Sequence, residues 1–389
     1  MATSRRARAV LAGCWVIAVG YNAYLIAPAS VAPRLAASFD GDAATAGLAI
    51  GAVYAAWVLV QVPAGAAMDR RDNRRLVLAG VAVYLVAAVA GFAAESAPGF
   101  LTSRFLGGTA AAFVWTANAN VVGRTFPAPR RAFATSLFVA SAPAGFALAQ
   151  FAGPLIAATA GWRATLLVYP LVTLVGVPVF LLAADDPVTS GADLSAAAFV
   201  ETLRRPSVLA ISGSSFCAYS LFLFFNSWMP TYATERLALD LAAAGAATAL
   251  VPLSGILARP GGGWLADRAG RRPVVAAALV LSVPALGGLL LVRSPGAFAA
   301  LLLSAGFVSQ LGIGVYYVYV AEVVGEVGRG TGLAVLTTAS VAGSLVSPVV
   351  TGWLITAVSW PAAFAYAAAL GLLGAGLVAL APRAATTGA

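Results

Sequence analysis

The residue whose type and position most suggest chemistry is Arg259, which lies inside the apolar segment 241–264. It precedes Asp267 by eight residues, which correspond to about 12 Å of helix. A guanidinium at that depth in a membrane is costly unless it faces a water-filled cavity or an anion. The position therefore favours an anion-binding site. The alternative is an arginine that reaches the cytoplasmic edge of the membrane or forms a structural pair.

A matching position in the first half of the chain is Gln61, which precedes Asp69 by the same eight residues. One charged group and one amide suit a single monovalent anion. Seven further polar or aromatic residues stand in apolar segments and are predicted to line the same site, although any one of them also suits packing: Asn22, Tyr24, Trp115, Asn118, Tyr219, Asn226 and Tyr316.

The sequence lacks the residues that other kinds of chemistry would need. The chain has no His, none of its fourteen acidic residues lies mid-segment, and Cys14 and Cys217 are far apart. A metal site, a bound cofactor and an enzyme activity are therefore not expected, and no Gly-Lys phosphate-binding motif suggests ATP as an energy source. The lack of an embedded carboxylate also disfavours proton-driven efflux of cationic drugs and favours anion transport.

The composition requires a membrane. Of 389 residues, 61% are hydrophobic and 10% are charged, whereas soluble domains carry roughly 25% charged residues. Apolar runs long enough to cross roughly 30 Å of hydrocarbon as helix predict an all-α polytopic protein of twelve spans. The predicted spans are 10–33, 44–66, 76–94, 98–121, 133–157, 163–184, 207–233, 241–264, 273–292, 296–321, 331–354 and 359–381.

The basic residues set the orientation. With the amino terminus inside, seventeen arginines fall on the cytoplasmic side, whereas only Arg34, Arg163, Arg236 and Arg293 fall outside. By the positive-inside rule, both termini are cytoplasmic and the protein lies in the inner cell membrane. The arginines occur as short clusters at alternate loops, so the net charge of +9 does not indicate a nucleic-acid partner.

An internal repeat divides the chain. The pattern Gly65-x-x-x-Asp69-Arg70 recurs as Gly263-x-x-x-Asp267-Arg268, an offset of 267 − 69 = 198 residues. The polar segment 185–206 lies midway between the two copies. We therefore expect an N-terminal six-helix half at 1–184, a cytoplasmic central loop at 185–206 and a C-terminal six-helix half at 207–389, with substrate bound near the bilayer midplane.

The stretch from Gly263 to Arg272 resembles the cytoplasmic-loop signature G-x-x-x-D-R-x-G-R-R of the major facilitator superfamily. The first copy has Asp72 and Asn73 where the family prefers Gly and Arg. The resemblance implies two six-helix halves related by a pseudo-twofold axis, latched between conformations by this motif. The alternative is that its arginines only set topology. The latch residues would be Gly65, Asp69, Arg70, Gly263, Asp267, Arg268, Arg271 and Arg272.

Two other segments resemble motifs of the same family. Arg104 and Gly108 match its R-x-x-x-G motif, which implies a coupling or structural role, although Arg104 could instead extend to the outer surface. Gly153-Pro154 is what remains of the motif that the family associates with antiport.

The resemblance also sharpens the functional prediction. An arginine at this place in the eighth span is similar to the substrate-anion arginine of the monocarboxylate, oxalate–formate and nitrate branches. Nitrate porters have arginine in both halves, so Gln61 favours a carboxylate or another monovalent anion. We predict a monomeric secondary transporter that moves a small anion by alternating access, with a proton or counter-anion as coupling partner. The alternative is efflux of neutral or amphipathic compounds, with Arg259 structural.

Overall fold

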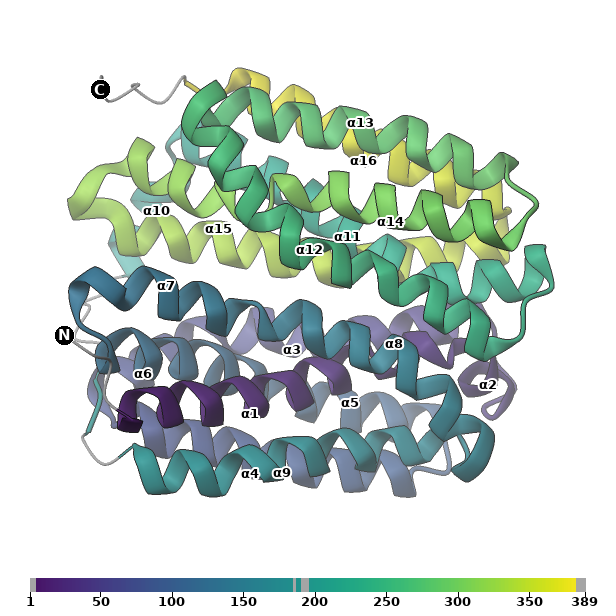
Figure 1. The fold of residues 1–389 in the computed structure, drawn as a ribbon, viewed down its shortest axis with the longest axis horizontal. Coiled ribbons are helices and arrows are strands. Elements are labelled where there is room, and N and C mark those ends of the chain that lie inside the picture. Colours follow the sequence, from purple (N-terminus) through teal and green to yellow (C-terminus); the bar gives the residue numbers. More distant parts are fainter. Residues whose placement is uncertain (1–4, 185–186, 190–195, 383–389) are drawn as a thin grey trace. The chain divides into compact units, whose positions relative to one another are not determined.

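The computed structural model describes residues 5–184, 187–189 and 196–382, and all regular elements within these ranges are helices (Figure 1). In the first half they are α1 (Arg5–Ser30), α2 (Ala32–Ala37), α3 (Ala43–Arg70), α4 (Asn73–Ala93), α5 (Ala97–Ala112), a π-helix (Phe113–Ala117), α6 (Asn118–Thr125), α7 (Ala128–Val139), α8 (Ser141–Ala160), a 3₁₀ turn (Trp162–Ala164) and α9 (Thr165–Ala183). In the second half they are α10 (Ala196–Leu203), α11 (Pro206–Leu237), α12 (Leu241–Ala269), α13 (Arg271–Leu291), α14 (Pro295–Leu311), α15 (Val315–Ala357) and α16 (Trp360–Leu380).

The helices confirm the predicted all-α membrane fold. Within the described ranges, eleven helical segments are long and apolar enough to cross a membrane. The fourth predicted span is formed by α5, the π-helix and α6 in succession. Gly325, with φ 76° and ψ 179°, interrupts α15 and separates the tenth span from the eleventh. Glycine suits this position because it has no Cβ to oppose a positive φ.

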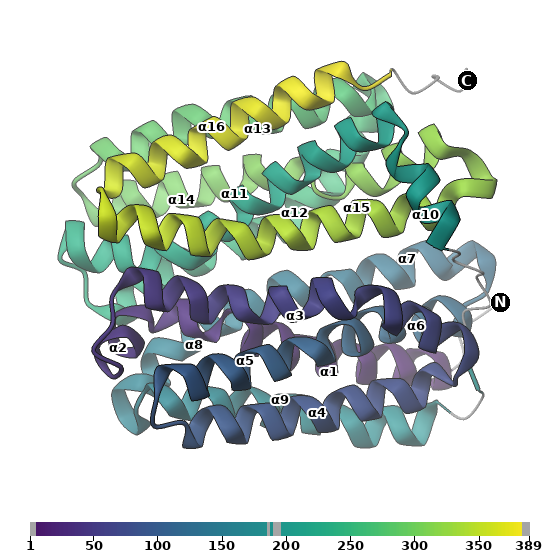
Figure 2. The same ribbon diagram turned by 180° about the vertical axis from the view of Figure 1, so that it is seen from behind.

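The chain divides into two compact units. The first comprises residues 1–40 and 52–193, and the second comprises residues 41–51 and 194–389. In the first unit α1 packs against α8 and α9, and α4 packs against α5 (Figure 2). In the second unit α11 packs against α15 and α16, and α12 packs against α14. The opening turns of α3 belong to the second unit, where Gly47 and Gly51 adjoin Pro348 and Val349 of α15.

The repeat extends beyond the loop motif to the residues that begin helices. Asp42 and Asp240, 198 residues apart, each accept a hydrogen bond from the backbone N–H three residues later, at 3.0 and 2.8 Å. Ser96 and Ser294, also 198 apart, do the same at 3.3 Å. These side chains satisfy N–H groups that a helix leaves unpaired at its start. Equivalent helices therefore begin at equivalent positions.

Close helix contacts follow the same offset. A Cβ at Gly108 would overlap the backbone of Val53, and a Cβ at Gly306 would overlap the backbone of Val251. Both pairs are related by 198 residues, since 306 − 108 and 251 − 53 both equal 198. Small residues allow helices to approach closely in a membrane, where packing rather than hydrophobic burial associates them. The two units therefore correspond residue by residue at this offset.

Candidate functional site in the second unit

Arg259 lies half-buried in α12, and its guanidinium is bound by a neutral side chain. Its Nε and Nη2 both donate to Oε1 of Gln310 in α14, at 3.3 and 3.1 Å. The ring of Phe222 lies 5.5 Å from the guanidinium carbon. Among the residues that the structure describes, no carboxylate forms an ion pair with Arg259. A positive charge therefore lies inside a membrane-spanning helix with no negative partner among the described residues.

The orientation of Gln310 is fixed at both ends. Its Nε2 donates to the backbone oxygen of Val251 at 2.7 Å and to that of Gly306 at 3.2 Å. Carbonyl oxygens only accept hydrogen bonds and a guanidinium only donates them. If the Gln310 amide were flipped, its oxygen would face the two carbonyl oxygens and its NH₂ group would face the guanidinium, so these hydrogen bonds could not form. Gln310 is fully buried. The sequence contained a signal for it, as a lone glutamine in a long apolar segment, but did not place it beside Arg259.

Two tyrosines complete the surroundings of Arg259. The hydroxyls of Tyr219 and Tyr317 lie 3.1 Å apart, and both residues are neighbours of Arg259. Tyr219 was predicted, but Tyr316 was chosen from the sequence instead of Tyr317. Tyr316 is buried and shares a hydrogen bond with Ser214 at 2.7 Å. Helical spacing from Gln310 could not have identified Tyr317, since α14 ends at Leu311 and α15 begins at Val315.

The equivalent place in the first unit is built differently. Gln61 is half-buried, and its Oε1 accepts a hydrogen bond from Nε1 of Trp57 at 2.8 Å. The ring of Trp57 stacks on Tyr54 at 6.4 Å between centroids. Trp57 occupies the repeat position of Gly255, since 255 − 57 = 198, and Ala112 occupies that of Gln310, since 310 − 112 = 198. This hydrogen bond engages the oxygen of the Gln61 amide, whose N–H groups can only donate.

Other predicted site residues point back to their own helices. Asn22, Asn118 and Asn226 are buried, and each donates to the carbonyl four residues earlier, at 2.8, 2.6 and 2.8 Å. Trp115 packs against Phe138 at 5.1 Å between ring centroids. A direct role of these residues in substrate binding remains a prediction.

Arg104 is fully buried rather than extended to the outer surface. Its Nη1 donates to the backbone oxygen of Tyr24 at 3.0 Å and its Nη2 to that of Leu25 at 2.7 Å, while its guanidinium lies 4.4 Å from the Tyr24 ring. Pro28 explains the arrangement. Proline has no N–H, so it leaves the carbonyl four residues earlier, that of Tyr24, without its helical donor. Arg104 supplies the missing hydrogen bond.

The remaining motif glycines differ in their surroundings. Gly153 allows α8 to approach Ser30 at the end of α1, so Gly153-Pro154 serves close packing within the first unit. Gly65 and Gly263 have no described atom within 4 Å of where a Cβ would stand. Their part in a latch stays a prediction.

The second copy of the loop motif joins three spans within its unit. Arg271 pairs with Asp267 at the end of α12 and with Glu322 near the end of the tenth span, at 3.1 Å. Arg268 stacks over Trp264 at 3.8 Å, and Arg272 donates to the backbone oxygen of Ala381 at 3.4 Å.

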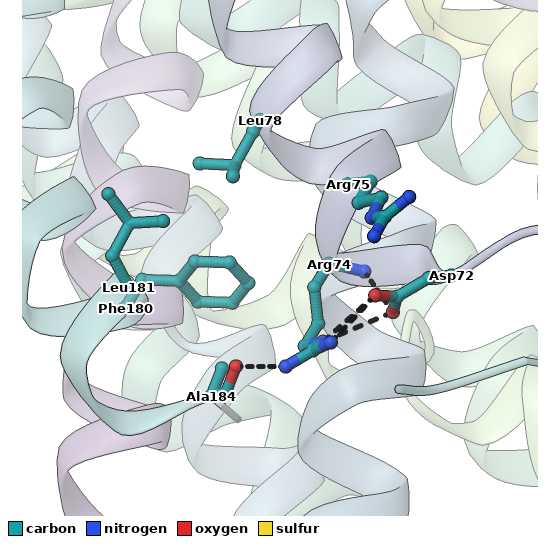
Figure 3. Close-up of a pocket in the computed structure, with 7 residues that line it drawn as sticks. All are labelled: Asp72, Arg74, Arg75, Leu78, Phe180, Leu181 and Ala184. Atoms are coloured by element: carbon teal, nitrogen blue, oxygen red, sulfur yellow. Dashed lines mark hydrogen bonds and ion pairs between the residues drawn. The ribbon is translucent and has the colours of Figure 1, made fainter. Parts of the chain in front are cut away.

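In the first copy of the loop motif, Asp72 and Asn73, which differ from the signature, bind the start of the central loop. The backbone N–H of Val188 donates to Asp72 at 3.1 Å, and its oxygen accepts from the backbone and side chain of Asn73, each at 2.7 Å. Figure 3 shows Arg74 between Asp72, at 2.8 Å, and the backbone oxygen of Ala184. Asp72, Arg74 and Ala184 line a hollow of about 300 Å³. Its other lining residues are Arg75, Leu78, Phe180 and Leu181.

Comparison with known proteins agrees with this architecture. Two repeated helical units with polar side chains held within the spans are the architecture of a secondary membrane transporter. The chain belongs to the Major Facilitator Superfamily, whose sequence profile it matches over residues 13–268 and 225–388. This is a family of transporters, and no catalytic activity is indicated.

Three relatives illustrate the branch. The chain is 29% identical over 280 residues to the probable nitrate/nitrite transporter NarK2 of Mycobacterium tuberculosis (strain ATCC 25618 / H37Rv), which covers 68% of each chain. It is 30% identical over 152 residues to the nitrite extrusion protein of Bacillus subtilis (strain 168), 39% of this chain and 38% of the relative. It is 26% identical over 246 residues to the probable anion transporter 6, chloroplastic, of Arabidopsis thaliana, 56% of this chain and 46% of the relative.

The hydrogen bonds from Arg104 to the segment of α1 before Pro28 predict that a substitution of Pro28 partly compensates for the loss of Arg104. Arg104→Met should destabilise the protein by about 3 kcal/mol, because two buried carbonyls lose a charged donor. Adding Pro28→Ala should recover part of that loss, because residue 28 regains an N–H for the carbonyl of Tyr24. Thermal unfolding of the purified variants measures both effects. If Pro28→Ala fails to improve the Arg104→Met protein, the proposed structural role of Arg104 is wrong.

The Asp72 contacts predict how firmly Val188 is attached. Burial opposes ionisation of Asp72, but hydrogen bonds from the Arg74 side chain and from the backbone N–H groups of Val188 and Arg74 outweigh it and lower its pKa below the ordinary 3.8. The attachment is therefore complete above pH 3.8 and weakens as the pH falls through the lowered value. Asp72→Ala should speed hydrogen exchange at the Val188 amide about tenfold.

Asp42→Ala is the matched control for this measurement, since Asp42 accepts hydrogen bonds in a different loop. Exchange at Val188 should be the same at pH 5 and pH 7 after correction for the intrinsic rate. Equal exchange in the Asp72→Ala and Asp42→Ala proteins would show that Asp72 does not hold the loop.

Proposed function

We propose that this protein is a secondary active transporter that moves a small monovalent oxyanion across the cytoplasmic membrane by alternating access. The observation that carries the proposal is the charge of Arg259, which lies within a membrane-spanning helix and is bound by a neutral glutamine. A cation in such a place is stabilised by an anion or by water in a cavity. A transported anion supplies that partner for part of each cycle.

A single negative charge is the best match for this site. The repeat position of Arg259 carries Gln61, so the second potential arginine of a two-arginine site is an amide here. An amide offers N–H donors without adding charge. One guanidinium with neutral donors from Tyr219 and Tyr317 suits an anion of charge −1.

Nitrate and nitrite are the first candidates, because two of the relatives are named for them. Small carboxylates such as formate are the second candidates. All of these anions are planar and present two oxygens that a guanidinium can bind as a pair. Charge and planarity therefore support the class, and transport assays must distinguish its members.

The chain offers no acidic or histidine side chain in mid-span for carrying a proton. Coupling is therefore assigned to a proton that accompanies the anion or to a counter-anion bound at the same arginine. Rocking of the two halves would expose the site to each side in turn. The ion pairs of Arg271 with Asp267 and Glu322 are suited to stabilise one of the two conformations in that cycle.

Substitution of Arg259 tests the proposal. In proteoliposomes, Arg259→Gln should reduce uptake of labelled nitrate or nitrite about 100-fold, since charge-assisted hydrogen bonds are worth about 3 kcal/mol. Arg259→Lys should retain a fraction, because it keeps the charge but loses the planar fork. Arg236→Gln is the matched control, since Arg236 is exposed at the end of α11.

The opposite result would favour efflux of neutral compounds. If the wild-type protein moves none of these anions, and Arg259→Gln leaves transport of an apolar compound intact, the anion proposal is wrong.

A further inference from the structure

We infer that Gln310 is the positioning residue of the anion site: it binds one edge of the Arg259 guanidinium and thereby presents the other edge to the substrate. The inference rests on the proposed function, because it specifies how the same arginine meets its anion. Gln310 itself need not touch the anion. It fixes the orientation of the Arg259 guanidinium without neutralising its charge.

The atoms that Gln310 contacts define which edge stays open. Nε and Nη2 form the side edge of a guanidinium, and both donate to the single oxygen Oε1. Of the five N–H donors of arginine, three remain, and they belong to the Nη1 and Nη2 end. Among the described residues, Nη1 of Arg259 has no hydrogen-bond partner. The open end is the geometry that binds two oxygens of a planar oxyanion in parallel.

The neutrality of Gln310 is as important as its position. A glutamate in its place would accept the same two hydrogen bonds but would neutralise the guanidinium and compete with the substrate. A leucine or methionine would leave the arginine free to change rotamer. Glutamine orients the cation through a dipole, and its own Nε2 is fastened to the backbone of Val251 and Gly306.

The packing around Gln310 is specific to the second unit. A Cβ at Gly255 would overlap the carboxamide of Gln310, and a Cβ at Gly306 would overlap the backbone of Val251. Both glycines are therefore needed for Gln310 to reach Arg259. At the repeat positions of Gly255 and Gln310, the first unit carries Trp57 and Ala112, so the same arrangement cannot form there.

The experiment measures nitrate binding to the purified full-length chain by titration calorimetry. Arg259→Gln should abolish binding. Gln310→Met should weaken nitrate about tenfold, the effect of losing one hydrogen bond to a charged group.

Gly255→Ala gives the same test without altering either polar residue. Its methyl group should displace the Gln310 side chain and weaken nitrate to a similar extent. Gly261→Ala is the matched control on the same helix, since a Cβ there meets nothing within 4 Å, and it should bind nitrate as the wild type does.

A pH profile separates positioning from a merely structural role. Gln310→Glu should bind no nitrate at pH 7.5, when the new carboxylate pairs with Arg259, and should regain binding as the pH is lowered and the carboxylate is protonated. A structural defect would give no such recovery. Wild-type binding should change little over the same range.

The outcomes distinguish the inference from the function on which it rests. If Arg259→Gln abolishes binding but Gln310→Met and Gly255→Ala bind nitrate as the wild type does, the role of Gln310 is wrong and the anion site stands. If Arg259→Gln retains nitrate binding, the proposed function itself is wrong.

Discussion

The constraint on which the rest of this structure depends is the cost of a charged guanidinium inside a membrane span. In the part of the chain that the structure describes, no carboxylate pairs with Arg259, and the dipole of Gln310, the face of Phe222 and the partial exposure of its side chain stabilise the charge instead. A carboxylate would have stabilised the resting protein better but would have removed the reason to bind an anion. The arrangement leaves the charge available.

The two arginines within the spans, Arg104 and Arg259, show how differently the same group can be used. Arg104 donates to the backbone oxygens of Tyr24 and Leu25 in the part of α1 that Pro28 interrupts, and its hydrogen bond to Tyr24 replaces the one that Pro28 cannot supply. Arg259 shares one edge with a single side chain and keeps the other edge open. Burial of an arginine therefore does not by itself indicate a substrate site. The partners of its individual nitrogens decide between structure and function.

Much of the fold could be predicted because membrane insertion leaves a strong pattern in the sequence. Apolar length predicted the spans, and the loop motif predicted a repeat that the structure extends to Asp42 and Asp240, and to Gly108 and Gly306. The sequence also identified Arg259. It did not pair that arginine with Gln310, because the contact depends on how closely α12 and α14 approach, which Gly255 and Gly306 set through packing rather than periodicity. Tyr317 follows the predicted Tyr316 by one residue, which is about 100° around a helix.

The central claim is that the guanidinium of Arg259 binds an oxyanion directly, and infrared difference spectroscopy tests it most directly. Isolated nitrate is threefold symmetric, and uneven hydration already splits its antisymmetric stretching band in water. Binding of two of its oxygens by a guanidinium replaces that hydration and changes the size of the splitting. Comparison of ¹⁴N- and ¹⁵N-nitrate isolates this band from those of the protein. The account predicts a saturable nitrate band in the wild-type protein whose splitting differs from that of nitrate in water, and which is absent from Arg259→Gln. A band with the splitting of nitrate in water, or a changed band that persists in Arg259→Gln, would contradict it.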